Sequence, residues 1–262
     1  MRGVVFQGNR QLEIQNFEDP TPGPGEVVLE IKASGMCGSD LKFYRSANAA
    51  IELGIGGDGS PIIAGHEPCG IVAEIGPGVN EKQAVIGQRV MDHHYYGCGV
   101  CHHCREGWSQ LCGDGFVVYG VTGHGAHADY MKVPVSTLIP LPDELSFAEG
   151  AAISCGTGTA YNALRRMNLV GGTTMAVFGQ GPVGLSATML APIMGVRVIA
   201  LDISPERLAL AQEFGAEHII NVSDDEPVQA IKDLTHSQGV DFALECSGVP
   251  DARVAAVRGA KT

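Results

Sequence analysis

Short apolar segments rich in β-branched residues, most of them bounded by glycine or proline, run through the first half of the chain. Such segments are typical of β-strands that bury one face. They predict strands at residues 3–6, 12–16, 27–33, 70–75, 89–92 and 128–133. The spacing of these strands favours a partly closed antiparallel barrel, which we assign to residues 1–154.

The hydrophobic period changes in the second half. Helical patterns come first, at 146–153 and 156–167. Strands at 174–178, 196–201, 218–221 and 240–245 then alternate with helices at 183–194, 205–214 and 226–235. Strand–helix alternation predicts right-handed βαβ units and a doubly wound parallel sheet, which we assign to residues 155–262.

The number of strands in this second domain is low for its class. A complete doubly wound dinucleotide-binding fold uses about six strands, and the pattern provides four before residue 262. We therefore expect this domain to be incomplete at its carboxyl end. We expect a full-length form to assemble as a homodimer or homotetramer.

Composition and charge restrict the partners. The chain of 262 residues has a formal net charge of -12 and an isoelectric point of about 5.1. Such a chain does not attract phosphate backbones or anionic lipid, so we expect no nucleic acid and no membrane partner. No apolar run reaches the roughly 18 residues of a membrane span, and the first residues lack a signal-peptide core. Eight cysteines without a secretion signal predict reduced thiols in the cytoplasm.

Four of the cysteines follow the compact spacing C-x2-C-x2-C-x7-C, namely Cys98, Cys101, Cys104 and Cys112. Each Cys-x2-Cys step turns the backbone so that two sulfurs face one point, and four thiolates make a closed tetrahedral zinc site. A closed site leaves no position for substrate, so its predicted role is structural. Two disulfides, unpaired thiols, or iron in place of zinc are the alternatives.

A glycine turn carries the signal for a dinucleotide. Gly179, Gly181 and Gly184 follow a predicted strand and open a predicted helix, with Pro182 and Val183 between them. In a dinucleotide site these glycines permit the turn, admit the pyrophosphate and pack helix on strand. The helix N-terminus favours the phosphate charge. The alternative is a structural turn that binds no ligand.

The residue that ends the next predicted strand is Asp202, 18 residues after Gly184. A carboxylate there accepts from both ribose hydroxyls and repels a 2′-phosphate, which favours NAD over NADP. Arg207 is the competing signal, because it could pair with that phosphate. Its alternative places are beside the adenosine ribose and on the exposed face of the helix.

A dispersed set of metal-binding residue types comprises Cys37, His66 with Glu67, and Cys155. Three protein ligands with one open position are typical of catalytic zinc. Spacing alone does not show that these segments meet, and any one of them alone is more often a buried thiol or a core histidine. A metal that polarises oxygen, combined with a cofactor that takes hydride, indicates an alcohol–carbonyl oxidoreductase.

Together these motifs resemble the zinc-dependent alcohol dehydrogenases of the medium-chain dehydrogenase/reductase superfamily. The resemblance covers the whole chain. It rests on Gly-x-Cys-Gly-x-Asp at 35–40, Gly-His-Glu at 65–67, the cysteines of 98–112, the stretch 151–161 and the glycine turn of 179–184. It implies a GroES-like barrel for the first domain and a Rossmann fold for the second.

The resemblance also implies roles for single residues. Cys37, His66 and Cys155 match the ligands of the catalytic zinc. Asp40 and Glu67 match carboxylates that lie beside that metal or exchange onto it, and Ser39 matches the hydroxyl that passes the substrate proton. His94 matches a position on the substrate-pocket wall, with a surface pair with His93 as the alternative. Cys246 lies where the family's chain passes the cofactor.

Two features depart from the family pattern, and a third narrows the expected range of substrates. Lys42 stands where many members have a relay histidine, so the proton relay is expected to use lysine, water or the cofactor ribose. The glycine-rich segment 48–60 is long for the family and is expected near the site mouth. Cysteine at 155, where many polyol dehydrogenases have glutamate, favours alcohols or aldehydes as substrates.

The function that we infer is hydride transfer between an alcohol, or its aldehyde or ketone, and NAD. The inferred metals are one catalytic and one structural Zn²⁺, and the partner is a small-molecule substrate. One alternative is a polyol or amino-alcohol dehydrogenase on the same scaffold. The other is an inactive zinc-binding fragment.

Overall fold

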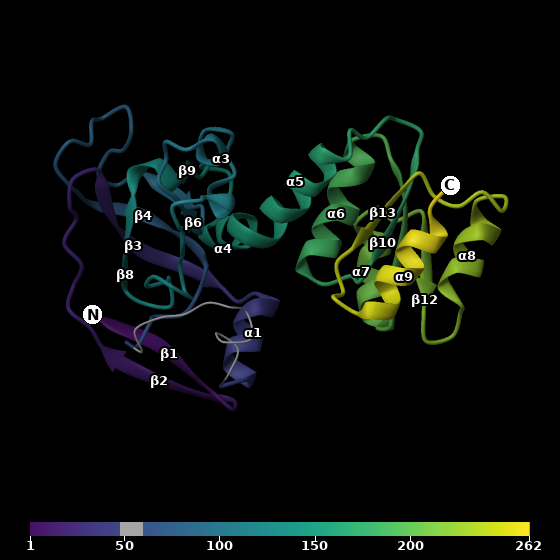
Figure 1. Cartoon of the computed structure of the whole chain (residues 1–262), viewed down its shortest axis with the longest axis horizontal. Helices are drawn as coiled ribbons and strands as arrows, with labels where there is room; N and C mark the ends of the chain where they lie inside the picture. Colours follow the sequence, from purple (N-terminus) through teal and green to yellow (C-terminus); the bar gives the residue numbers. More distant parts are fainter. Residues whose placement is uncertain (48–59, 262) are drawn as a thin grey trace. The chain divides into compact units, whose positions relative to one another are not determined.

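The computed structural model describes residues 1–47 and 60–261. The chain divides into two compact units, Met1–Cys155 and Gly156–Thr262 (Figure 1). Most of the glycine-rich segment at 48–60, which we expected near a site mouth, lies outside the described residues. No helix in the described part of the chain combines the length and apolar character needed to span a bilayer.

The first unit is built on a five-stranded antiparallel sheet with strand order β8-β3-β4-β5-β9. Its strands are β3 (Glu26–Gly35), β4 (Glu67–Ile75), β5 (Arg89–Asp92), β8 (Tyr130–Pro134) and β9 (Leu138–Pro140). The hairpin β1 (Arg2–Gly8) and β2 (Gln11–Asn16) and the pair β6 (Tyr95–Tyr96) and β7 (Val117–Val118) complete the β-structure. β-Branched residues such as Val27, Val72 and Val133 fill the core of this unit because they pack well on a pleated face.

Short helices accompany the strands of this unit. They are α1 (Gly38–Arg45), α3 (His102–Arg105), α4 (Phe147–Ala152) and the 3₁₀ turns η1 (Ser109–Leu111) and η2 (Val135–Thr137). A π-helical turn, η3 (Ile153–Thr157), continues α4. π-Helical turns are rare and often occur at functional sites.

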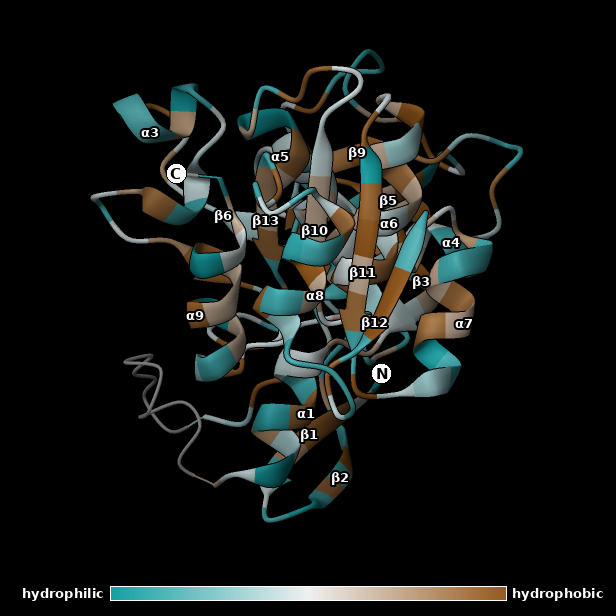
Figure 2. Cartoon of the chain, turned by 90° about the vertical axis from the view of Figure 1, so that its right-hand side faces the viewer, coloured by the Kyte–Doolittle hydropathy of each residue, from teal (hydrophilic) through white to brown (hydrophobic). Residues whose placement is uncertain are grey.

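The second unit is a four-stranded parallel sheet with strand order β12-β11-β10-β13. Its strands are β10 (Thr174–Phe178), β11 (Arg197–Asp202), β12 (His218–Asn221) and β13 (Phe242–Glu245). The helices are α5 (Gly158–Arg166), α6 (Pro182–Ile193), α7 (Pro205–Glu213), α8 (Pro227–Leu234) and α9 (Pro250–Gly259). Figure 2 shows that α9 carries both hydrophilic and hydrophobic bands, as a helix on one face of a sheet should.

The two faces of this parallel sheet bury different hydrophobic clusters. Met175 and Val177 point into a cluster with Ala187 and Ala191 of α6. Ala176 and Phe178, their alternating neighbours, point into a second cluster with Ile231 of α8 and Ala255 of α9. Helices therefore cover both faces, which confirms the doubly wound class.

The structure confirms every predicted strand, with ends moved by a few residues. The helical pattern at 156–167 was partly wrong, because the π-turn occupies its first residues and α5 begins at Gly158. The fourth parallel strand begins at Phe242 rather than at Val240, which makes only an isolated bridge to Ala260. Helices α1, α3 and α9 were not predicted.

Candidate functional site

The dispersed residues come together in the first unit. Donor atoms of Cys37, His66, Glu67 and Cys155 all lie within 4.8 Å of one another, and we refer to this group as the Cys37 cluster. Three elements position it: Cys37 precedes α1, His66 precedes β4 and Glu67 opens it, and Cys155 lies in η3. Cys37 is half-buried and the other three are buried, so most of the cluster is shielded from solvent.

Asp40 connects two members of the cluster. Its Oδ2 accepts a hydrogen bond from the backbone N–H of Cys37 at 2.8 Å, which caps the first turn of α1. Its Oδ1 accepts from Nδ1 of His66 at 3.0 Å. The other ring nitrogen, Nε2, lies 3.2 Å from the hydroxyl of Ser39. One buried carboxylate thus sets both the position of Cys37 and the orientation of the His66 ring.

The electrostatics of the cluster favour a cation. Hydrogen bonds from Cys155 and then His66 lower the pKa of Cys37, so that a thiolate forms here. Burial opposes charge on His66, but hydrogen bonds with Asp40 and Cys37 outweigh it and raise its pKa to about 10. Burial, followed by the charge of Cys37, raises the pKa of Glu67 to about 7. Thiolate sulfur and imidazole nitrogen are donors that zinc prefers, so these residues fit that metal.

Gly35 makes room for the carboxylate of Glu67. The two residues are paired across β3 and β4, and a β-carbon on residue 35 would collide with Oε2 of Glu67. A glycine two residues before Cys37 therefore has a packing reason that the motif alone does not reveal.

His127, which sequence reasoning missed, supports the segment that leads into His66. Its backbone N–H donates to Ala64 O at 2.9 Å, and its Nδ1 lies 2.7 Å from the hydroxyl of Ser34. Gly65 has a φ of +91°, and a β-carbon there would collide with the His127 ring. In the sequence His127 stands in a short Gly-Ala-His run, which has no distinctive chemistry that would indicate this supporting role.

His94 lies beside the cluster and is not part of a surface pair. It is only 7% exposed, and its ring meets that of His66 edge to face with centroids 5.2 Å apart. The ring of Tyr95 is also close, with its centroid 4.3 Å from that of His94. Its Nδ1 is buried and has no hydrogen-bond partner among the described residues. The surface interpretation of this histidine was wrong.

Ser39 and Lys42 lie on α1, three residues apart, where side chains share a helix face. Both are exposed, in contrast to buried Asp40 between them. The structure thus places a hydroxyl at the cluster and an ammonium group one helical turn further along the same helix.

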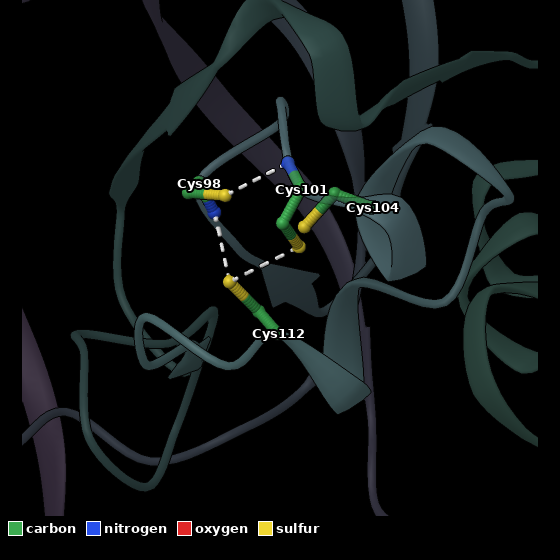
Figure 3. Close-up of side chains that lie close together, drawn as sticks. All are labelled: Cys98, Cys101, Cys104 and Cys112. Atoms are coloured by element: carbon green, nitrogen blue, oxygen red, sulfur yellow. Dashed lines mark hydrogen bonds between the residues drawn. The ribbon is translucent and has the colours of Figure 1, made fainter.

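The four remaining predicted metal ligands form a second group, the four-cysteine cluster (Figure 3). Its sulfurs also lie within 4.8 Å of one another, and Sγ of Cys101 and Cys112 are 3.9 Å apart. Four thiolates about 2.3 Å from a tetrahedral ion lie about 3.8 Å from one another, so the spacing fits zinc. All eight cysteines are free, so the disulfide alternative is wrong for this structure.

The glycine turn has the expected geometry. Gly179 has a φ of +85°, and a β-carbon on Gly184 would collide with the carbonyl oxygen of Gly179. Apart from its own chain neighbours, no atom of residues 1–47 and 60–261 lies within 4 Å of where a β-carbon of Gly181 would be, so the backbone there is open to a ligand. Pro182 begins α6, and Val183 follows it. These residues fit a pyrophosphate at a helix N-terminus.

Asp202 ends β11 beside this turn. Its carboxylate accepts from the N–H groups of Gln180 at 2.6 Å, Ile203 at 2.8 Å and Ser204 at 2.9 Å. Arg207 is exposed, and its guanidinium lies 3.9 Å from Oδ2 of Asp202. A mostly apolar cavity of about 280 Å³ opens here, and its lining includes Gly179, Asp202, Ile203, Ser247 and Val249.

Cys246 follows β13 at the same edge of the sheet. Its backbone N–H donates to Phe178 O at 2.8 Å, which places residue 247 against the glycine turn. Burial, and secondarily the charge of Glu245, raises the pKa of its thiol to about 12. The Cys246 thiol is therefore neutral, and its place beside the cofactor, which the resemblance implies, stays a prediction.

Known proteins share this arrangement. A family model for an alcohol dehydrogenase GroES-like domain matches residues 23–143, and one for a zinc-binding dehydrogenase matches 182–261. The chain is 38% identical to an uncharacterized zinc-type alcohol dehydrogenase-like protein of Escherichia coli (strain K12), over 98% of this chain and 73% of that protein. It is 34% identical to sorbitol dehydrogenase of Bacillus subtilis (strain 168), over 96% and 70%. Alcohol dehydrogenase TADH from Thermus sp. ATN1 has a TM-score of 0.88 at 31% identity, over 100% and 75%.

The antiparallel unit with two clusters that could hold a metal ion, together with the doubly wound unit, defines a medium-chain dehydrogenase/reductase. Within that superfamily, the chain belongs to the zinc-dependent alcohol dehydrogenase family of oxidoreductases. The resemblance inferred from the motifs is thereby confirmed.

Proposed function

We propose that this protein is a zinc-dependent oxidoreductase that moves hydride between an alcohol, or its aldehyde or ketone, and NAD. The observation that carries the proposal is the convergence of Cys37, His66, Glu67 and Cys155 within 4.8 Å. Three neutral or anionic donors of the types that zinc prefers, with a carboxylate beside them, are typical of an open catalytic site.

In this proposal Cys37, His66 and Cys155 hold a catalytic zinc. When bound, that metal would act as a Lewis acid on the substrate oxygen and lower the pKa of its hydroxyl. Asp40 keeps the His66 ring in the orientation that presents Nε2 to the cluster, through the 3.0 Å hydrogen bond at Nδ1. Glu67 adds negative charge beside the ligands.

Ser39 is proposed to move the proton. Its Oγ lies 3.2 Å from His66 Nε2, so the hydroxyl is next to the position where a substrate oxygen would bind. Because Ser39 is exposed on α1, it can pass a proton outward. Lys42 lies one turn further along the same helix and is proposed as the next station, together with water.

The second unit is proposed to bind NAD through the turn of Gly179, Gly181 and Gly184. The open backbone at Gly181 and the N-terminus of α6 would receive the pyrophosphate. Asp202 lines the adjoining cavity and would accept from the adenosine ribose hydroxyls while repelling a 2′-phosphate. Arg207 would then pair with Asp202 rather than with a phosphate.

The four-cysteine cluster is proposed to hold a structural zinc. All four positions of a tetrahedral ion would be filled by Cys98, Cys101, Cys104 and Cys112, so no position remains for chemistry. Its contribution would be to fix the lobe that follows β6.

A polyol or amino-alcohol substrate is the second candidate function. Two observations favour it: a polar, buried histidine beside the Cys37 cluster and the similarity to a sorbitol dehydrogenase. The non-enzymatic alternative is a zinc-binding fragment, which differs from both candidates because it would show no turnover with any alcohol.

The deciding experiment is a screen for NAD and NADP reduction with alcohols and polyols, with zinc per chain measured on the same sample. Zinc-dependent turnover with NAD would support the proposal. A zinc-loaded protein without turnover for any alcohol would leave the fragment alternative in its place.

A further inference from the structure

Gln180 is a buried polar side chain within the glycine turn, between Gly179 and Gly181. It is 0% exposed, and so is Thr188, which lies in the second turn of α6. The amide nitrogen Nε2 of Gln180 donates to the carbonyl oxygen of Val177 at 2.9 Å, and its Oε1 accepts from the Thr188 hydroxyl at 2.9 Å. A carbonyl oxygen can only accept, so these partners also fix which way the amide faces. Both polar ends of a fully buried side chain are therefore satisfied inside the domain.

These hydrogen bonds join the two elements that the turn connects. Val177 lies near the end of β10, which leads into the turn, and Thr188 lies in α6, which follows it. Gly181, next to Gln180, keeps the open backbone that would receive the pyrophosphate. The Gln180 side chain thus ties strand to helix directly beneath the residue that faces the ligand in the proposed function.

The backbone of Gln180 reaches a third element. Its N–H donates to Oδ2 of Asp202, at the end of β11, at 2.6 Å. The other carboxylate oxygen, Oδ1, accepts from the N–H groups of Ile203 and Ser204. The position of Oδ2 therefore depends on residue 180. One residue borders both the turn proposed for the pyrophosphate and the carboxylate proposed for the ribose.

Packing alone does not account for two polar residues at positions 180 and 188. Apolar side chains of similar volume would fill the same space without the cost of burying an amide and a hydroxyl. A buried polar pair whose hydrogen bonds are all made holds the elements that it joins in one arrangement. The arrangement held here is that of the glycine turn.

We propose that Gln180 and Thr188 form a positioning pair that sets the shape of the glycine turn, so that affinity for the dinucleotide depends on a hydrogen bond that the dinucleotide does not touch. This inference rests on the proposed function and deepens it. Without the Thr188 hydroxyl, Oε1 of Gln180 would be buried without a donor, and the side chain would turn to reach another one. The peptide of residue 180 would move with it, and so would the N–H that holds Asp202 and the open backbone of Gly181.

The test measures the dissociation constant of NADH by fluorescence titration of the zinc-loaded protein, without alcohol. Thr188→Val keeps the shape of the side chain and removes its hydroxyl. It should raise this dissociation constant about tenfold, the effect of one buried acceptor left without a donor. Thr188→Ser keeps the hydroxyl and should bind NADH like the wild type.

Thr235→Val is the matched control for lost stability. The Thr235 hydroxyl donates to Ile231 O at 2.7 Å and accepts from the N–H of Gly239 at 3.0 Å. Thr235 ends α8, at the edge of the sheet opposite to the edge where a doubly wound fold binds its ligand. This variant should lower the thermal midpoint and leave the NADH dissociation constant unchanged. The same result for Thr188→Val, a lower midpoint with wild-type affinity, would overturn the inference.

A double variant, Gln180→Met with Thr188→Val, removes the amide and the hydroxyl together, and it stands in for Thr188→Val if that variant does not fold. Because neither polar group is left without the other, it should regain stability relative to Thr188→Val. It should still bind NADH weakly, since the turn is no longer held, and wild-type affinity would overturn the inference. A wild type that binds neither NADH nor NADPH would overturn the proposed function together with the inference. The expected affinities without turnover of any alcohol would overturn the proposed function alone.

Discussion

The carboxylate of Asp40 and the imidazole of His66 are joined by a hydrogen bond of 3.0 Å between two buried side chains. The same carboxylate also holds the backbone of Cys37 at 2.8 Å. Two members of the Cys37 cluster, 29 positions apart in the sequence, therefore depend on one residue that is not a member. Metal sites commonly owe 10–100-fold in affinity to partners of this kind.

Substitution of Asp40 should reduce zinc affinity at the Cys37 cluster in two steps. Asp40→Asn keeps one acceptor oxygen and should lose about tenfold, because it can serve Cys37 or His66 but not both. Asp40→Ala should lose up to about 100-fold. Competition with a zinc chelator measures this, and the four-cysteine cluster of the same protein is the internal control. Equal weakening of both clusters would mean general unfolding instead.

The two clusters should release zinc at different rates. A closed four-thiolate site can provide roughly 10–16 kcal/mol of apparent binding free energy, and the Cys37 cluster has fewer protein thiolates. A chelator should therefore remove one equivalent of zinc early, with loss of activity and retention of the circular-dichroism spectrum. Metal analysis during the time course measures the two phases. A protein with one zinc per chain and full activity would contradict this.

Gly35 and Gly38 offer a matched pair for the packing of Glu67. A β-carbon at 35 would collide with Glu67 Oε2, whereas a β-carbon at 38 would meet no atom within 4 Å in the described part of the chain beyond the neighbouring backbone. Gly35→Ala should lower the free energy of unfolding by about 1–3 kcal/mol through overpacking. Gly38→Ala, in the first turn of α1, should be neutral or slightly stabilising. Denaturant unfolding of the zinc-loaded protein measures both, and similar values would show that Glu67 moves aside freely.

Local patterns were enough to predict most of the fold. Alternating and continuous apolar runs identified the strands because strand burial repeats every two residues, as Met175 to Phe178 illustrate on both faces of the sheet. Helix α1 was missed because its stretch Gly38 to Arg45 has a single buried residue, Asp40, and so no apolar stripe. A capping interaction and tertiary contacts stabilise that helix instead.

The candidate site could be predicted only in part. The four-cysteine cluster follows from spacing, because its ligands are local. The approach of Cys37, His66 and Cys155 depends on pairing between strands and on η3, so family resemblance had to supply it. The support from His127 and the burial of His94 are tertiary properties, and no local pattern in the sequence encodes either one.

Asp202 should govern cofactor choice. Asp202→Ala removes the acceptor for the ribose and the repulsion of a 2′-phosphate, so the ratio of kcat/KM for NAD to that for NADP should fall by about tenfold or more. The variant also removes acceptors for Gln180, Ile203 and Ser204, so some loss of stability should accompany the change. Asp202→Asn is the control that keeps part of this network. A wild type that already prefers NADP would mean that Arg207, rather than Asp202, governs the choice of cofactor.

Substitutions along the proposed proton path on α1 should lower kcat less as the residue lies further from His66. Ser39→Ala removes the hydroxyl that lies 3.2 Å from His66 Nε2, so kcat should fall by about 10²–10⁴-fold, the usual contribution of a positioned proton-transfer group. Ser39→Thr keeps a hydroxyl and is the matched control. Lys42→Ala should cost much less, because the exposed lysine lies one turn further out and water can replace it. Zinc content should stay constant in all three variants, since neither side chain belongs to the Cys37 cluster. Equal and severe losses for Ser39→Ala and Lys42→Ala would instead mean that Lys42 touches substrate or cofactor directly.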